Sequence, residues 1–113
     1  MKITSINCVD YTAEQIITLL FDICPELQNN KRRRKQVFLG ITNDIVRSIR
    51  EHNITIDKII FYAQTATLRV AEKVKKIARE LGFGIEDVKH RENGANSFSL
   101  YVYAYVITHE SKQ

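Results

Sequence analysis

The sequence predicts an α+β domain: a small mixed β-sheet of about four strands with three helices, in two or three layers and in the order β-α-β-α-β-α-β. Two observations predict this class. Short segments rich in β-branched and aromatic residues have the length and composition of strands. Between them lie longer segments whose apolar residues recur at helical spacing. The segments alternate without a linker or an internal repeat, so residues 1–113 are expected to form a single domain.

The composition is that of a globular protein. Of the 113 residues, 44% are hydrophobic and 27% are charged. No apolar run approaches the roughly 20 residues that a membrane-spanning helix needs. Met1 to Asp10 lack the charged and then apolar pattern of a signal peptide. We therefore expect a cytoplasmic protein with no membrane partner.

The cysteines and histidines suggest no cofactor. Cys8 and Cys24 have no CxxC spacing, and isolated cysteines in a cytosolic chain are most often small buried apolar residues. A disulfide or a redox role is the alternative. His52, His90 and His109 lie far apart and form no zinc-like spacing.

The N-terminal part of the chain predicts a strand, a helix and a loop. Lys2 to Cys8 reads as a short strand. Thr12 and Gln15 have the spacing of a capping box, and the wide apolar face after them predicts a helix that ends before Pro25. The polar and basic stretch from Glu26 to Lys35 is expected to be a loop.

A second strand and helix follow. Gln36 to Ile41 is nearly all apolar, so we expect a strand that is covered on both faces. Thr42-Asn43-Asp44 offers oxygen atoms that can cap a helix, which should end near His52-Asn53. Three apolar residues of this helix are expected to face the interior, namely Ile45, Val46 and Ile49.

The last part of the chain completes the alternation. Lys58 to Ala63 is expected to be a strand, and Thr65 to Leu81 is expected to be the longest helix, with Gly82 as its stop. Ile85 to Ser97 is polar and predicts a loop. Ser97 to Thr108 has the clearest strand alternation, with apolar residues on one face and tyrosines on the other.

Positive charge is concentrated in one run. The net charge is +4, and the five consecutive cations Lys31, Arg32, Arg33, Arg34 and Lys35 exceed it, so the rest of the chain is slightly acidic. Such a run suits a phosphate backbone, which it contacts without reading sequence. We therefore expect these residues to contact DNA or RNA. The alternatives are a solvated loop and a basic patch for an acidic protein partner.

A second candidate contact lies where the Gln36 to Ile41 strand meets the next helix. Gly40 would let a phosphate or a backbone come close, and Thr42 begins a turn into a helix start, which attracts anions. Arg47 and Arg50 lie about one turn apart on one helix face, so both could reach phosphate oxygens. The alternative is a capped surface helix with solvated arginines.

The same stretch resembles a known family. Val37 to Asn53, VFLGITNDIVRSIREHN, resembles the second half of the GIY-YIG nuclease module, in which a Tyr-Ile/Val-Gly strand leads into a Thr-Asn-Asp-like turn and an arginine-bearing helix with a late His. The residues in register are Gly40, Thr42, Asn43, Asp44, Arg47 and His52. The resemblance implies a GIY-YIG-like domain with Arg47 and His52 as catalytic candidates. If the domain cleaves, it also implies Mg²⁺ or Mn²⁺, with Glu72 as the candidate metal ligand.

The departures from the family pattern favour binding without cleavage. Phe38 stands where the family has a tyrosine, and Ser48 stands where it has the catalytic arginine. The first half of the signature is expected about ten residues upstream, and Glu26 to Asn30 contains nothing like it. Glu72 lies opposite the apolar stripe of its helix, where a surface pair with Lys76 would explain it. A hydrolase of this kind needs a positioned base, a cation and usually a metal.

A ladder of tyrosines is the last candidate site. Tyr101, Tyr103 and Tyr105 are expected on one face of the last strand, where three rings could stack on bases. The alternative is that the rings pack under a helix.

Three functions follow from these observations. The first, which the departures favour, is a nucleic-acid-binding protein without cleavage activity and without a cofactor. The second is an active metal-dependent endonuclease that uses Arg47, His52 and Glu72. The third is a phage or mobile-element protein-interaction module that inhibits a nucleic-acid-processing protein partner.

Overall fold

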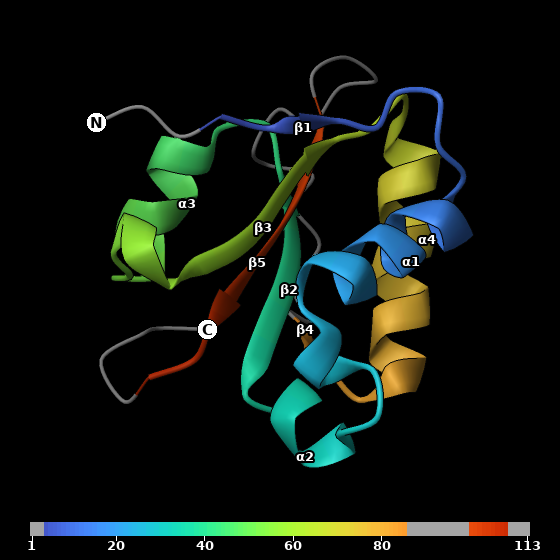
Figure 1. The fold of residues 1–113 in the computed structure, drawn as a ribbon. Coiled ribbons are helices and arrows are strands. Elements are labelled where there is room, and N and C mark those ends of the chain that lie inside the picture. Colours follow the sequence, from blue (N-terminus) through green and yellow to red (C-terminus); the bar gives the residue numbers. More distant parts are fainter. Residues whose placement is uncertain (1–3, 86–99, 109–113) are drawn as a thin grey trace.

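A computed structural model describes residues 4–85 and 100–108 and has an α+β fold built on one mixed five-stranded sheet (Figure 1). The strands are β1 (Ile6–Asn7), β2 (Val37–Thr42), β3 (Ile59–Gln64), β4 (Gly84–Ile85) and β5 (Tyr101–Val106). The helices are α1 (Ala13–Ile23), α2 (Lys31–Arg34), α3 (Ile45–Glu51) and α4 (Leu68–Leu81), with 3-10 turns at Pro25–Leu27 and Ile56–Lys58. The predicted fold class is confirmed, although the described residues add a strand and a short helix to the expected set.

The last strand lies in the middle of the sheet. The strand order is β1-β3-β5-β2-β4, and β5 runs antiparallel to both of its neighbours, β2 and β3. The outer strands β1 and β4 pair in parallel with β3 and β2. The sheet is therefore mixed, as the sequence predicts, and its centre comes from the end of the described chain.

Helices cover both faces of the sheet. Figure 1 shows α1 and α4 on one side of the sheet and α3 on the other. Val37, Leu39 and Ile41 of β2 belong to the larger apolar core, which they form with α1 and α4. Phe38 and Tyr103 belong to a second core beneath α3. The strand alternation therefore separates two cores, and the three-layer form is the one adopted.

Local signals set the ends of the longer helices. Thr12 Oγ1 accepts a hydrogen bond from Gln15 N at 3.1 Å, and Thr12 N donates to Gln15 Oε1 at 2.8 Å, which confirms the capping box. At the start of α4, Thr67 Oγ1 accepts from Val70 N at 3.2 Å. At its end, Gly82 adopts a left-handed conformation with φ of 95°, which glycine tolerates best.

The prediction of a loop from Glu26 to Lys35 is wrong. This stretch contains a 3-10 turn and then α2, whose first turn is capped by Asn30. The Asn30 side chain accepts a hydrogen bond from Arg33 N at 3.0 Å. Tertiary contacts stabilise α2 where the local sequence shows only charge, so composition alone indicated a loop.

Two smaller expectations are also corrected. Val46 is 58% exposed, because Ile45 and Ser48 take the inward face of α3. Gly84, for which the sequence predicts no strand, begins β4 beside β2. The polar loop expected from Ile85 to Ser97 lies outside the described residues, except for Ile85 itself.

Both cysteines behave as small apolar core residues. Cys8 and Cys24 are free and buried, as the sequence predicts. Burial raises the pKa of both thiols, and the nearby Glu26 carboxylate raises that of Cys24 further. Within residues 4–85 and 100–108, no helix has both the length and the apolar character to cross a bilayer.

Candidate nucleic-acid interface

The turn from β2 into α3 is organised by one buried hydroxyl. Thr42 Oγ1 accepts hydrogen bonds from Asp44 N at 2.9 Å and Ser48 Oγ at 2.7 Å, and it donates to Asp44 O at 3.0 Å. Asp44 in turn caps α3, because its carboxylate accepts from Arg47 N at 3.2 Å. Thr42 and Ser48 are both buried. The expectation that Thr42 contacts a phosphate is therefore corrected, since its hydroxyl is used within the fold.

The two arginines of α3 differ in their contacts. Arg47 Nη2 donates to Asn43 Oδ1 at 2.6 Å, and Arg47 Nε lies 3.6 Å from Glu51 Oε1. The Arg47 side chain is 34% exposed and Glu51 is 50% exposed, so this pair is worth under about 1 kcal/mol. Arg50 is exposed, and no carboxylate within the described ranges pairs with it. A phosphate would have to displace contacts of Arg47 but not of Arg50.

Gly40 is buried and makes room for an aromatic ring. It lies directly opposite Tyr103 in the β2–β5 ladder. A Cβ atom on Gly40 would lie 2.8 Å from Phe38 Cε1 and 3.1 Å from the Tyr103 hydroxyl oxygen. The expectation that Gly40 admits a phosphate is therefore wrong, because side chains of the second core already fill that space.

The tyrosine ladder divides into a buried and a half-buried part. Tyr103 and Tyr105 are fully buried and pack with Phe38 and His52 beneath α3. The Phe38 ring centroid lies 5.0 Å from that of His52 and 5.0 Å from that of Tyr105. Base stacking on Tyr103 and Tyr105 is therefore excluded in this conformation, and the packed alternative describes these two rings.

His52 belongs to the same buried cluster. Only 5% of it is exposed, and its Nδ1 atom lies 3.3 Å from the Tyr105 hydroxyl. A general acid or base must come within hydrogen-bond reach of its substrate. The burial of His52 among aromatic rings therefore gives it a packing role here, in contrast to the catalytic role that the family resemblance implies.

Tyr101 is the residue of the ladder that solvent still reaches. It is half-buried, and its ring centroid lies 5.1 Å from that of Tyr62 on β3. Burial raises the pKa of Tyr62 to about 12, with smaller contributions from Tyr101 and the Asp44 carboxylate. Tyr62 therefore keeps its proton at neutral pH.

The basic run forms a ridge on the surface. We call Lys31, Arg32, Arg33 and Lys35 the cationic ridge. Lys31, Arg32 and Lys35 are exposed, whereas Arg33 is half-buried and its Nη1 donates to Gln36 Oε1 at 3.0 Å. Among the residues that the structure describes, no carboxylate lies within ion-pair distance of the ridge. This part of the protein therefore leaves the charge of the ridge unneutralised.

The Arg34 side chain points inward and binds backbone carbonyls of the protein itself, whereas the sequence predicts a contact with phosphate. Its Nε donates to Leu81 O at 2.7 Å, and its Nη1 donates to Leu27 O at 2.9 Å and to Gln28 O at 3.0 Å. Leu81 is the last residue of α4, so the guanidinium meets an otherwise unpaired carbonyl at the negative end of that helix. Arg34 is corrected from a phosphate contact to a structural residue.

The cationic ridge and the Arg47/Arg50 face are separate surfaces. Figure 1 shows α2 leading into the start of β2 and α3 following its end. A strand of six residues is roughly 17–20 Å long at about 3.3 Å per residue. The two candidate contacts that the sequence predicts therefore lie at opposite ends of β2.

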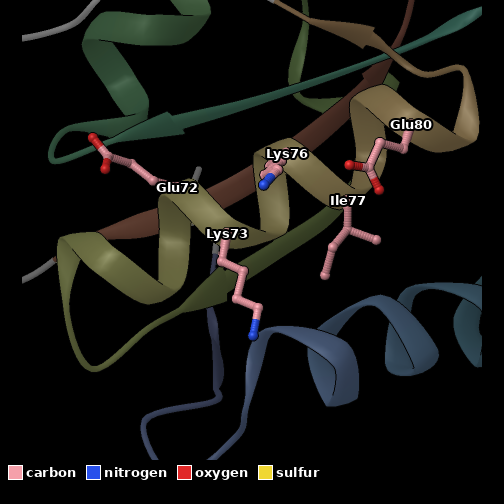
Figure 2. Close-up of a pocket in the computed structure, with 5 residues that line it drawn as sticks. All are labelled: Glu72, Lys73, Lys76, Ile77 and Glu80. Atoms are coloured by element: carbon pink, nitrogen blue, oxygen red, sulfur yellow. The ribbon is translucent and has the colours of Figure 1, made fainter.

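Glu72 does not lie near the other catalytic candidates. It is exposed on α4, whose inward side packs on the larger core, whereas Arg47 and His52 belong to α3 and its C-cap on the opposite face of the sheet. Figure 2 shows Glu72 pointing away from Lys76 and Glu80, while Lys73 reaches toward α1. There Lys73 Nζ lies 3.0 Å from Glu14 Oε2.

The structure therefore does not assemble the proposed metal-dependent site. Arg47, His52 and Glu72 are not brought together. Within residues 4–85 and 100–108, no three His, Cys, Asp or Glu side chains are grouped as a metal ion would require.

Comparison with protein-family models, with curated protein sequences and with solved structures finds no match to this chain. The inward role of Arg34 and the packing of Tyr103 on Gly40 are the features that sequence reasoning missed. Nothing distinguishes Arg34 from its four basic neighbours in the sequence. The tyrosine alternation placed Tyr103 on one face of β5, but only the strand order shows that Gly40 lies opposite it.

Proposed function

We propose that this protein binds nucleic acid through its phosphates, with the cationic ridge as the contact surface. The observation that carries the proposal is the unneutralised charge of Lys31, Arg32 and Lys35, which are exposed on one short helix and its C-cap. Double-stranded nucleic acid carries one negative charge about every 1.7 Å along its axis, and cations that replace its counterions gain binding free energy from their release. An acidic protein surface would offer carboxylates at lower density.

The ridge supports a weak contact that does not depend on sequence. Three to four cations at a duplex backbone give a slope of log K against log salt of about −3. The exposed residues of α2 are Lys31 and Arg32, with no aromatic side chain between them to stack on a base. Contacts to phosphate position a protein on nucleic acid and carry no sequence information.

Binding is tested by fluorescence anisotropy with labelled single- and double-stranded DNA and RNA across a range of salt concentrations. In the variant Lys31→Gln/Arg32→Gln/Lys35→Gln, we expect the affinity to fall and the salt slope for the duplex to shrink by about 2–3, since each phosphate contact adds about 0.9. The matched control is Arg69→Gln/Lys73→Gln/Lys76→Gln, which removes the same charge from exposed positions of α4. It should bind nearly as wild type does.

Two results would contradict the proposal. The wild-type protein could ignore all four nucleic acids at low salt, or the α4 control could lose as much binding as the ridge variant. The second result would mean that net charge, and not the ridge, attracts the ligand. Capture of a single acidic protein with the same ridge dependence would favour the protein-interaction function instead.

We also propose that this protein has a GIY-YIG-like fold that binds nucleic acid but does not cleave it. In its favour is the unit of β2, the Thr42–Asp44 turn and the arginine-bearing α3, whose C-cap is His52. The family's tyrosine is Phe38 here, although the Tyr103 hydroxyl approaches Gly40 from β5 instead. Adding Mg²⁺ or Mn²⁺ to the binding samples should produce no cutting, and cutting would restore the endonuclease alternative.

A further inference from the structure

We infer that Arg34 is the positioning residue of the cationic ridge: it fixes α2 to the body of the protein so that its neighbours present their charges in one arrangement. The inference rests on the proposed function of the ridge. In this view Arg34 has a structural role, and the four residues of the cationic ridge remain available to bind a ligand.

α2 has little stability of its own. It has four residues, all of them cations, and none of them is buried. Isolated helices shorter than about 12 residues are marginal even in favourable sequences, and like charges in one turn repel one another. The Asn30 cap contributes one hydrogen bond, from Arg33 N at 3.0 Å, which does not offset these costs. The helix must therefore be held by contacts outside itself.

The Arg34 guanidinium supplies those contacts in two directions. Nε reaches the end of α4 at Leu81 O, and Nη1 reaches Leu27 O and Gln28 O at the end of the 3-10 turn, all within 3.0 Å. A lysine has a single nitrogen at its tip, whereas the planar arginine fork can bridge groups on two sides. Arg34 thus ties α2 to two other elements at once.

The ridge gains a fixed arrangement from this tie. Arg34 alone meets the Leu81 carbonyl at the negative end of α4, so the other four cations are not needed there. The alkyl chain of Lys31 passes beside Gly82, with its Cγ and Cε atoms 3.5 Å from the position of a Cβ. Holding the ridge in place before binding removes the entropy cost of ordering it when the ligand arrives.

The test compares two variants that keep the charge. Arg34→Lys breaks the bridge, and Arg32→Lys is the control at an exposed neighbour. Each is titrated with the duplex that wild type binds best, and amide hydrogen exchange is measured at α2 and α1. We expect Arg34→Lys to lose exchange protection at α2 but not at α1, and to bind about tenfold more weakly, a change that equals one lost charge-assisted hydrogen bond. Its salt slope should not change, and Arg32→Lys should match wild type.

Asn30→Ala loosens α2 by a second route, because it removes the cap and leaves Arg34 and α4 untouched. It should also lower the affinity with an unchanged salt slope, and it carries the test if Arg34→Lys unfolds the domain. The inference is overturned if Arg34→Lys binds as Arg32→Lys does, or if Asn30→Ala loses α2 protection at no cost in affinity. If the wild-type protein binds no nucleic acid, the proposed function fails. If amide exchange protection at α2 is unchanged in Arg34→Lys, Arg34 does not fix α2, whatever the binding result.

Discussion

The hydroxyl groups of Thr42 and Ser48 stabilise the junction between β2 and α3. Thr42 Oγ1 takes part in three hydrogen bonds, with both backbone groups of Asp44 and with Ser48 Oγ. Each Thr42 bond lies in a buried or half-buried setting, where an unpaired polar group costs about 1–3 kcal/mol. The order of the turn therefore depends on Thr42 more than on Ser48, which makes one of these bonds.

This difference can be measured. Thr42→Val keeps the shape of the side chain but leaves Asp44 N and Ser48 Oγ without their partner, and we expect it to lower the free energy of unfolding by about 2–3 kcal/mol. Ser48→Ala should cost about 1 kcal/mol. Thr18→Val on the exposed face of α1 is the control and should change little. Urea denaturation measures these free energies of unfolding. Equal losses for Thr42→Val and Ser48→Ala would contradict the hydrogen-bond network described for this turn.

Tyr62 gives the protein a pH dependence in the alkaline range. Its pKa is raised to about 12 in the folded state, whereas an unfolded tyrosine titrates near 10. Between these values the folded state holds more protons than the unfolded state, so stability must fall as pH rises from about 10 toward 12. Tyr62→Phe lacks this contribution. The gap in urea midpoint between wild type and Tyr62→Phe should therefore shift in favour of the variant between pH 9 and pH 11, and a constant gap would rule the effect out.

Individual site residues were harder to predict than the elements that carry them. Gly40 and Arg34 both lie in features that the sequence predicts, the second strand and the basic run. Their roles depend on Tyr103 and Leu81, which are 63 and 47 positions away along the chain. No local pattern connects such pairs, so the glycine was interpreted as open space and the arginine as a ligand contact.

At the scale of elements, the predictions are confirmed where the cause is local. α1 begins at its capping box, and α4 ends at Gly82, because the capping groups lie within a few residues of the helix end. α2 and β4 were missed because each is short and depends on a distant partner, α4 for the first and β2 for the second. Short elements with distant partners leave little periodicity in a sequence.

The end of α4 offers a test at this scale. Gly82 has φ of 95°, a conformation that costs a residue with a Cβ atom about 1–2 kcal/mol. We expect Gly82→Ala to lower the free energy of unfolding by about that amount, measured by thermal denaturation. Gly82→Asn should lose less, because asparagine visits the left-handed region more readily. If both variants matched wild type, the backbone conformation at this position would not limit stability.

For the whole molecule, the alternation of strands and helices was sufficient to predict an α+β class. It was not sufficient to predict the strand order, because any of the expected strands could have occupied the centre. The separation of the two basic surfaces follows from the chain itself, because β2 lies between α2 and α3. The cationic ridge and the Arg47/Arg50 face therefore lie at opposite ends of this strand, although they are close in the sequence.

The central place of β5 also bears on how this protein is made. The ribosome synthesises β2 and β3 well before β5, the strand that joins them in the sheet. Until then each of those two strands keeps an edge of unpaired backbone groups, to which another extended chain could add. During synthesis the β1–β3 and β2–β4 pairs therefore both lack β5 as a neighbour. The risk that β2 or β3 pairs with another chain is greatest just before β5 leaves the ribosome.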